Sequence, residues 1–408
     1  MLHIIPSDKF TTNVFCVLIR LPLCREGVTQ TALLPPLLSR GSAKYPTMRD
    51  IRLVAESLGG AVFDAQIVKK GEEQVLQFFL EYADNGLSLK KRGLDFLQEV
   101  IQYPLVEEKG FYAPHVKGEC ENLKNRIIGR INNKSEYAKL KCIEAMCQGE
   151  PFGLYGDGYV EDLPNVSPEG LLSRYHNIKN SYPMEFIALG KWNQTSVADK
   201  NWLEEEIVAR FGDIGSKKMK IPTSILRPAR PKYQVIRLDH GSAQGRICIG
   251  LRGDFFSVGM DFIHFQLVNE ILGGGSNSKL FANVREKESL CYAIFSVIYR
   301  FKSLMCILAG TEIDKLEYVL QLAEKEVEDL KQGHFSKEEF NNAKESLSKR
   351  WRAMLDNPSA CIDFYASQHM IGDHYTAKEL LLQLHKATPD GVLLVASRLN
   401  IDTVVTLT

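Results

Sequence analysis

The chain has 408 residues, 45% of them hydrophobic and 25% charged, which predicts a soluble globular protein of two domains, each of about 200 residues. Fifty Lys and Arg residues balance fifty Asp and Glu residues. This balance excludes a general electrostatic attraction to nucleic acid or to a membrane surface, although it leaves room for a local patch.

The first residues contain an apolar run after Asp8 and Lys9, which we interpret as a strand rather than a signal peptide. No apolar segment of the sequence reaches the ~18 residues of a membrane-spanning helix. The nine cysteines lack CxxC spacing and are expected to be reduced thiols, most of them buried in the core. We therefore expect a cytoplasmic protein that does not act at a membrane.

The first half of the chain predicts strands followed by helices. The helix from Met48 to Leu58 begins at the capping residue Thr47 and ends at a glycine pair. The other predicted elements are the strands NVFCVLI (13–19), AVFDAQIV (61–68) and EQVLQFFLEY (73–82), and the helices at about 87–101 and beyond Pro114.

The second half repeats this order of elements after residues 215–232, which are rich in Lys, Arg and Pro and form the predicted linker. The expected elements are the strand RICIGL (246–251), a helix at about 258–272, a short helix at about 276–287, the strands CYAIFSVIY (291–299) and LMCILAGTE (304–312), and long helices at 314–331 and from 336 onward.

Each half also contains a matched helix start near its end. Residues 167–170, Ser-Pro-Glu-Gly, and residues 388–391, Thr-Pro-Asp-Gly, share a hydroxyl cap, a proline, an acid and a glycine. The sequence therefore predicts an α+β fold of two tandem homologous lobes, each a mostly antiparallel sheet with helices packed on one face. The predicted lobes span residues 1–214 and 233–408, joined by the linker at 215–232.

The stretch LGGGSNSKLFANVREKESLCYAIFS (272–296) combines a glycine run with Arg285 and Tyr292. Spacing alone predicts that Arg285 interacts with carbonyls at its helix end and that Tyr292 is half-buried in a strand. The stretch also resembles the second-lobe signature of the pitrilysin/insulinase metallopeptidases, which include the mitochondrial processing peptidase. Within that family the chain resembles in particular the YfmF-type zinc-less subunits of Gram-positive bacteria, through ALLPPLLSRGSAKYPT and KGECENLKNRI.

Active relatives carry the motif His-x-x-Glu-His on a first-lobe helix, with a distant glutamate as third zinc ligand. Ala32, Pro35 and Pro36 occupy the motif positions in this chain, and Arg126 occupies the place of the third ligand. None of these residues binds zinc, and the two prolines are expected to interrupt the helix or to start it at Pro35. The nine histidines contain no i, i+4 pair that would replace the site.

The family resemblance implies a different role for Arg285 and Tyr292. In active relatives the matching pair holds the substrate backbone and donates to the oxyanion of the tetrahedral intermediate. Asn283 is expected to face the substrate as well. Gly273, Gly274 and Gly275 would let the backbone approach an extended peptide.

These expectations combine into one hypothesis. The chain would be the catalytically inactive subunit of a heterodimeric metalloendopeptidase, supplying Arg285 and Tyr292 to a zinc-bearing paralogous subunit that carries His-x-x-Glu-His. Its substrate would be a peptide or unfolded protein, with no cofactor in this chain. The isolated chain could pair with itself, as a homodimer without metal. The alternatives are a non-catalytic scaffold and a module that binds peptides at a sheet edge; an independent zinc peptidase is disfavoured.

Overall fold

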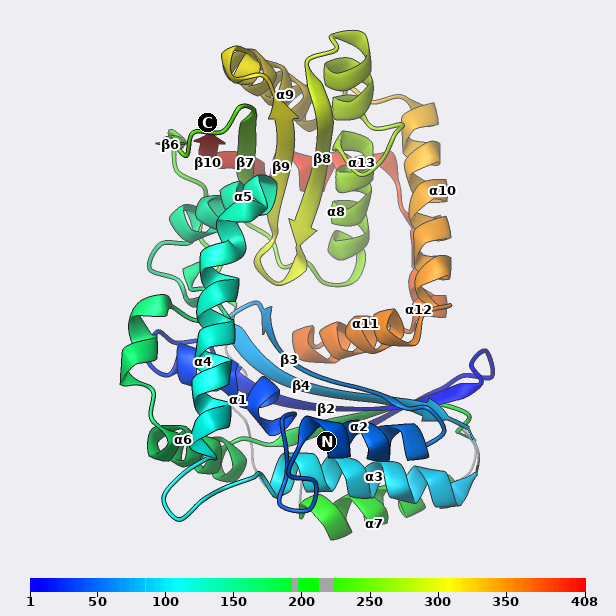
Figure 1. Cartoon of the computed structure of the whole chain (residues 1–408). Helices are drawn as coiled ribbons and strands as arrows, with labels where there is room; N and C mark the ends of the chain where they lie inside the picture. Colours follow the sequence, from blue (N-terminus) through cyan, green and yellow to red (C-terminus); the bar gives the residue numbers. More distant parts are fainter. Residues whose placement is uncertain (85, 193–196, 213–223) are drawn as a thin grey trace. The chain divides into compact units, whose positions relative to one another are not determined.

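The computed structural model describes residues 1–84, 86–192, 197–212 and 224–408. The chain forms two compact units (Figure 1). Unit 1 contains Met1–Ile128 and Leu154–Pro222, and unit 2 contains Gly129–Gly153 and Thr223–Thr408. Each unit is built on one five-stranded sheet.

The sheet of unit 1 has the order β1-β5-β2-β4-β3, in which β1 and β5 are parallel and the other neighbours antiparallel. Its strands are β1 (Leu2–Pro6), β2 (Thr12–Pro22), β3 (Val62–Lys70), β4 (Glu73–Ala83) and β5 (Met184–Gly190). The last strand is thus inserted between the first two.

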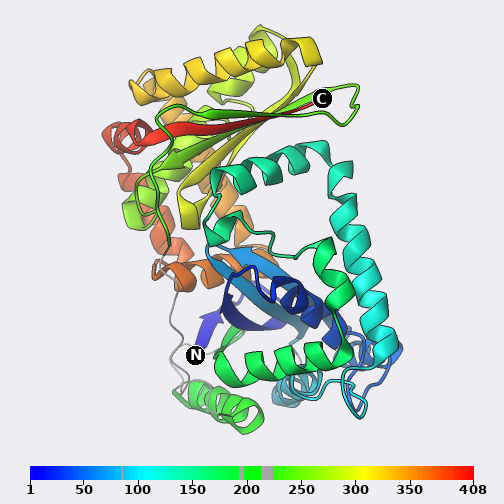
Figure 2. The same ribbon diagram turned by 90° about the vertical axis from the view of Figure 1, so that its left-hand side faces the viewer.

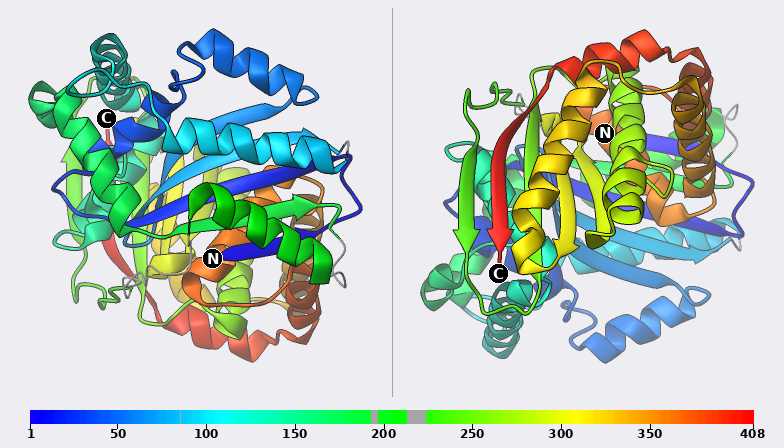
Figure 3. Two further views of the ribbon diagram at one scale, coloured as in Figure 1. Left: turned by 90° about the horizontal axis from the view of Figure 1, so that it is seen from below. Right: turned by 90° about the horizontal axis from the view of Figure 1, so that it is seen from above.

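The sheet of unit 2 has the order β6-β10-β7-β9-β8, which is the same order when the strands are counted within the unit. Here β10 is parallel to β6 (Figure 3, right) and antiparallel to β7. The strands are β6 (Gln234–Leu238), β7 (Gly245–Gly253), β8 (Cys291–Tyr299), β9 (Leu304–Thr311) and β10 (Leu399–Leu407). The common order confirms the predicted pair of tandem α+β lobes.

The helices of unit 1 cover one face of its sheet, and α2, α3 and α7 lie together on that face in Figure 1. Alternate residues of β2, among them Phe15, Val17 and Ile19, point into the core that these helices close. The helices are α1 (Val28–Leu38), α2 (Met48–Ser57), α3 (Leu87–Gln102), α4 (Ala113–Ile128), α6 (Pro168–Ser181), α7 (Val197–Phe211) and the short η3 (Val160–Asn165).

Unit 2 has helices on both faces of its sheet. In Figure 2 the sheet is seen nearly edge-on, with α9 on one side and α5 on the other. The helices are α5 (Lys134–Met146), α8 (Gly259–Leu272), α9 (Leu316–Lys331), α10 (Lys337–Met354), α11 (Pro358–Ile371), α12 (Ala377–Lys386) and α13 (Pro389–Ser397), with the short turns η1 (Gly129–Asn132), η2 (Pro151–Gly153), η4 (Phe281–Lys287), η5 (Arg300–Lys302) and η6 (Ile313–Lys315).

The α5 segment was expected in the first lobe, but it packs on the sheet of unit 2. Ala138, Cys142 and Met146 of α5 form an apolar cluster with the sheet face that α8 and α9 leave uncovered. A buried ion network adds to this packing. Glu150 accepts from Arg252 Nη2 at 2.5 Å and from Lys302 Nζ at 2.8 Å, and all three side chains are at most 3% exposed.

The matched helix starts are present in both units. The Ser167 hydroxyl accepts from the N–H of Gly170 at 3.0 Å, and the Thr388 hydroxyl accepts from the N–H of Gly391 at 3.2 Å. Each of these helices, α6 and α13, leads into the strand inserted in the middle of its sheet. The repeat read from the sequence therefore corresponds to a repeated helix-strand connection.

Part of the predicted linker, residues 215–223, lies outside the described residues, and residues 224–232 form neither helix nor strand. None of the helices in the described part of the chain combines the length and apolar character of a membrane-spanning helix.

Candidate functional site

The positions of the zinc motif lie on α1, a helix with an apolar and mostly buried surface. Ala32 is 1% exposed, Pro35 is buried and Pro36 is half-buried. Arg126 is exposed in the last turn of α4. These four side chains offer no atom that would coordinate zinc or accept a proton from water.

The predicted interruption of this helix is wrong, because α1 runs from Val28 to Leu38 with both prolines inside it. Pro35 and Pro36 cannot donate to the carbonyls four residues earlier. The helix persists because Leu33, Leu34 and Leu37 are each at most 3% exposed in the core of unit 1. Tertiary burial therefore outweighs the local cost of the prolines.

The buried carboxylate on α4 is that of Glu119, and it already has partners within unit 1. Arg40, just after α1, forms an ion pair with Glu119, which also accepts from Asn122. Burial, with a smaller contribution from the Arg40 charge, lowers the pKa of His115 on the same helix. The buried carboxylate of α4 is therefore paired with a cation of the chain itself.

The glycine run at 273–275 ends α8 and lies against β8. Gly273 is buried, and its carbonyl accepts from the N–H of Ser296 at 2.9 Å. A Cβ at Gly273 would lie 2.6 Å from Ser296 Oγ, and one at Gly274 would lie 2.5 Å from Glu270 Oε1. Close packing therefore requires glycine at these two positions, whereas Gly275 is exposed with open space around it.

Arg285 and Asn283 lie on η4, which is wound as a π-helix, a form that often marks functional sites. Regular helix was predicted from about Ser276, but the helical residues begin at Lys279. Arg285 is exposed and its guanidinium lies 4.5 Å from the ring centre of Phe281. Asn283 Nδ2 donates to Glu326 Oε1 of α9 at 2.8 Å, so its amide is engaged within the unit.

Tyr292 lies at a β-bulge near the start of the edge strand β8. Cys291 pairs with Thr311 and Ala293 pairs with Gly310, which leaves Tyr292 as the extra residue between them. Its side chain is 54% exposed. Ser289, with φ of 52°, follows the end of the π-helix at Lys287 and precedes β8.

Arg285 and Tyr292 flank Cys291 on two elements that pack together, η4 and β8. Burial raises the pKa of Cys291 to about 11, and the positive charge of Arg285 opposes this shift. Tyr292 in turn contributes to the raised pKa of Lys315, after the larger effect of the hydrogen bond to Glu312. The structure thus brings the predicted arginine, tyrosine and glycine run to one edge of unit 2.

Phe295 belongs to the same edge and was not predicted as part of the site. It is 41% exposed and lies on β8 three residues after Tyr292. The sequence CYAIFSVIY gave no signal for it, because Phe295 is exposed whereas the polar Ser296 is buried. Exposed and buried residues alternate from Ala293 to Ser296, and the bulge leaves Tyr292 out of that alternation.

Known proteins are similar to this chain in sequence. Residues 165–347 match the family model described as the Peptidase M16 inactive domain. The "Probable inactive metalloprotease YmfF" of Bacillus subtilis (strain 168) is 27% identical over 409 aligned positions, covering 98% of this chain and 94% of the relative.

Solved structures show the same fold over the whole chain. A conserved protein from Enterococcus faecalis V583 has a TM-score of 0.87 at 25% identity, covering 100% of this chain and 95% of that one. A peptidase M16 inactive domain from Pseudomonas fluorescens has a TM-score of 0.78 at 16% identity, covering 99% of this chain and 94% of the other.

The two lobes have the fold of a solved M16-type protein, and residues 165–347 match the M16 family model. The resemblance to the pitrilysin/insulinase metallopeptidases, family M16, that the sequence predicts is therefore confirmed, and it includes a relative described as a probable inactive metalloprotease.

Proposed function

We propose that the chain is the non-catalytic subunit of a heterodimeric M16-type metalloendopeptidase and supplies Arg285 and Tyr292 to the active site of a zinc-bearing partner. The observation that carries the proposal is the contrast between the two predicted sites. The motif positions on α1 hold apolar and mostly buried side chains, whereas Arg285 and Tyr292 are exposed on η4 and β8, two elements that pack together.

The chemistry of these two side chains fits such a role. A guanidinium has five N–H donors and a tyrosine hydroxyl is both donor and acceptor. In the described part of the chain Arg285 contacts the Phe281 ring and makes no ion pair, so its donors remain open to a substrate. Donors of this kind stabilise the oxyanion that forms when zinc-bound water attacks a peptide bond.

The partner would carry the elements that this chain lacks. Its zinc would be bound through His-x-x-Glu-His, and the glutamate of that motif would activate the water. The substrate would be a peptide or unfolded protein rather than nucleic acid, in keeping with the balance of fifty basic and fifty acidic residues. We place this activity in the cytoplasm.

Cleavage of a quenched fluorescent peptide by the zinc-bearing paralog tests the proposal. Activity should require the wild-type chain and should fall about 10²–10³-fold in kcat with Tyr292→Phe or Arg285→Ala, the range typical of a lost oxyanion donor. Lys287→Ala, an exposed cation on the same π-helix, is the matched control. Equal activity with all versions, or without the chain, would refute the proposal.

The second candidate is a non-catalytic scaffold or peptide-binding protein. Tyr292 and Phe295 expose aromatic surface along the edge strand β8, which is where an added strand would pair. This candidate predicts affinity for extended peptides without any partner. Binding that is lost with Phe295→Ala and unaffected by Tyr292→Phe would favour it over the subunit role.

A further inference from the structure

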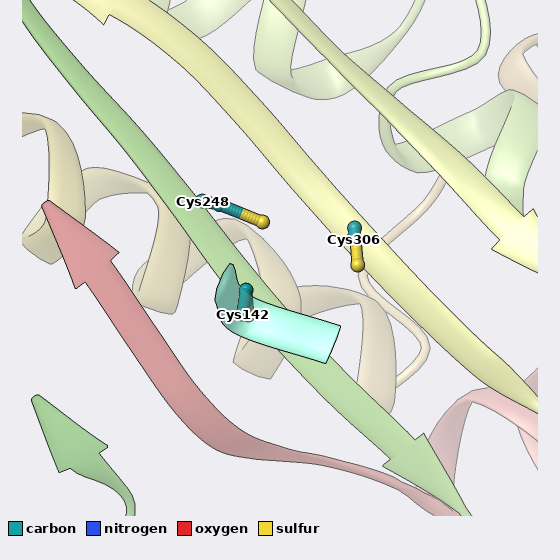
Figure 4. A group of neighbouring side chains, drawn as sticks. All are labelled: Cys142, Cys248 and Cys306. Atoms are coloured by element: carbon teal, nitrogen blue, oxygen red, sulfur yellow. The ribbon is translucent and has the colours of Figure 1, made fainter. Parts of the chain in front are cut away.

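Three cysteine sulfur atoms converge inside unit 2, away from the edge that carries Arg285 and Tyr292. They come from Cys142 on α5, Cys248 on β7 and Cys306 on β9, and all three Sγ atoms lie within 4.8 Å of one another (Figure 4). Each residue is 0% exposed. The three positions are far apart in the sequence, so their spacing gave no sign of a site.

The backbone of β7 makes room for this cluster. Gly250 pairs in register with Cys306, and a Cβ at Gly250 would lie 2.8 Å from Cys142 Sγ and 3.0 Å from Met146 Sδ. Glycine at this position therefore allows α5 to bring its thiol down to the sheet. The thioether of Met146 lies beside the same point.

The strand register disfavours a disulfide between the two sheet cysteines. Cys248 pairs with Leu308, two residues beyond Cys306 on β9, so the two cysteines are diagonal neighbours. Diagonal Cα atoms are about 7–8 Å apart, beyond the ~4.4–6.8 Å that a disulfide spans. A metal with sulfur bonds of about 2.3 Å instead holds its ligand sulfur atoms nearly 4 Å apart, which is compatible with the observed convergence.

The donor set is soft and its surroundings are apolar. The cluster packs with Ala138, Ile143, Leu308 and Val405, all at most 4% exposed. In the described residues no histidine or carboxylate joins the three thiols at ligand distance. Soft sulfur ligands select Cu⁺, Zn²⁺ or iron–sulfur clusters. Structural Zn²⁺ sites and iron–sulfur clusters are held by four protein ligands, so a set of three thiols favours Cu⁺.

We propose that Cys142, Cys248 and Cys306 form a trithiolate site for one thiophilic monovalent metal ion, with the coordination chemistry of Cu⁺. The bound ion joins α5 to β7 and β9 and so fastens the segment 129–153 to unit 2. This differs from the expectation that the chain carries no metal. It is independent of the role of Arg285 and Tyr292, because the two sites share no residue.

The test is anaerobic titration of the reduced full-length chain with Cu⁺ against a chromophoric competing chelator. The background variant is Cys24→Ser, since Cys24 is the exposed cysteine among the described residues. We expect one Cu⁺ per chain by native mass spectrometry, a thiolate-to-copper absorption band, and a Tm that rises with Cu⁺. Zn²⁺ should bind more weakly.

Single cysteine substitutions test which residues bind the ion. Cys142→Ala and Cys306→Ala should each weaken Cu⁺ binding by more than about 100-fold, since even outer-shell partners contribute about 10–100-fold. Cys361→Ala, another buried cysteine of unit 2, is the matched control and should bind as the background does. If Cys306→Ala fails to fold, Cys142→Ala decides, because it changes a helix residue rather than a strand.

If Cys142, Cys248 and Cys306 only fill space in the core, the titration should show no 1:1 complex with Cu⁺. Absence of a 1:1 Cu⁺ complex in the background variant would overturn the proposal. Equal loss of binding in Cys361→Ala and Cys142→Ala, or unchanged binding in Cys142→Ala, would overturn it as well.

Discussion

The N–H of Ser296 donates a 2.9 Å hydrogen bond to the carbonyl of Gly273, which joins the end of α8 to the outer edge of β8. Gly273→Ala would place a methyl group 2.6 Å from Ser296 Oγ and 2.8 Å from Ser296 N. We expect a loss of about 1–3 kcal/mol in the free energy of unfolding, the usual cost of overpacking, measured by urea denaturation.

Gly275→Ala is the control for this prediction. Gly275 has no atom within 4 Å of an added Cβ among the described residues. The substitution should leave stability unchanged or raise it by about 0.4–1 kcal/mol, because alanine lowers the conformational entropy of the unfolded chain. Equal losses at both glycines would show that flexibility, rather than close packing, sets the need for glycine here.

The buried carboxylate of Glu150 is predicted to be essential for the stability of unit 2. Glu150→Gln would remove the carboxylate that contacts Arg252 and Lys302, at 3% and 0% side-chain exposure, and would leave Arg252 a longer 3.8 Å contact with Asp402. Breaking a buried pair in this way costs about 3–5 kcal/mol. Glu328→Gln removes a 57% exposed partner of Lys331 and should change urea unfolding by less than about 1 kcal/mol.

His264 is predicted to make stability depend on pH. Gly391 of the repeated helix start leaves space for its ring, since a Cβ there would lie 2.2 Å from His264 Cε1. Burial lowers the pKa of His264, while Asp261 partly opposes the shift. Between this lowered pKa and the unfolded value near 6.5 the unfolded chain binds more protons, so stability falls as pH drops below about 6.5.

Between the lowered pKa of His264 and about pH 6.5, the free energy of unfolding should change by at most ~1.4 kcal/mol per pH unit. The measurement is the urea midpoint at pH 7.5 and 5.5, for the wild-type chain and His264→Gln. The variant should show a smaller difference between the two pH values. His334→Gln, at a 62% exposed side chain, should show the same difference between the two urea midpoints as the wild type. An equally reduced difference in both variants would contradict the assignment of the pH dependence to His264.

Asn283→Ala is predicted to loosen η4 from α9. Burial raises the pKa of Glu326, and the Asn283 hydrogen bond opposes that shift. Without this donor the 6% exposed Glu326 loses its partner on η4, at a cost of about 1–3 kcal/mol. Unchanged stability together with a raised KM for peptide in the heterodimer assay would instead favour direct contact of Asn283 with substrate.

Local patterns were sufficient to predict most elements of the fold. The capping pair Thr47 and Asp50 forms the expected reciprocal hydrogen bonds, and Gly273 ends α8 where the sequence placed its end. In the two Ser/Thr-Pro-acid-Gly helix starts, the hydroxyl likewise caps the helix within four consecutive residues. These features depend on neighbours in sequence, which is why the sequence alone reveals them.

Features made by distant residues could not be predicted in the same way. The helix α1 continues through Pro35 and Pro36 because its surroundings in the core compensate for the missing donors. The bulge at Tyr292 depends on its register with β9. The approach of Cys142 to Cys248 and Cys306 depends on α5 joining unit 2 and on the glycine at position 250.

The position of β10 between β6 and β7 has a consequence for biosynthesis. In unit 2 the strand translated last occupies the interior of the sheet, so the ribosome must pass Leu407 before β6 can join the rest. Until then β6 has no partner strand and the edge of β7 stays open. A nascent unit 2 therefore presents two unpaired strand edges to chaperones until β10 is made, and a variant that lacks β10 would remain in that state permanently.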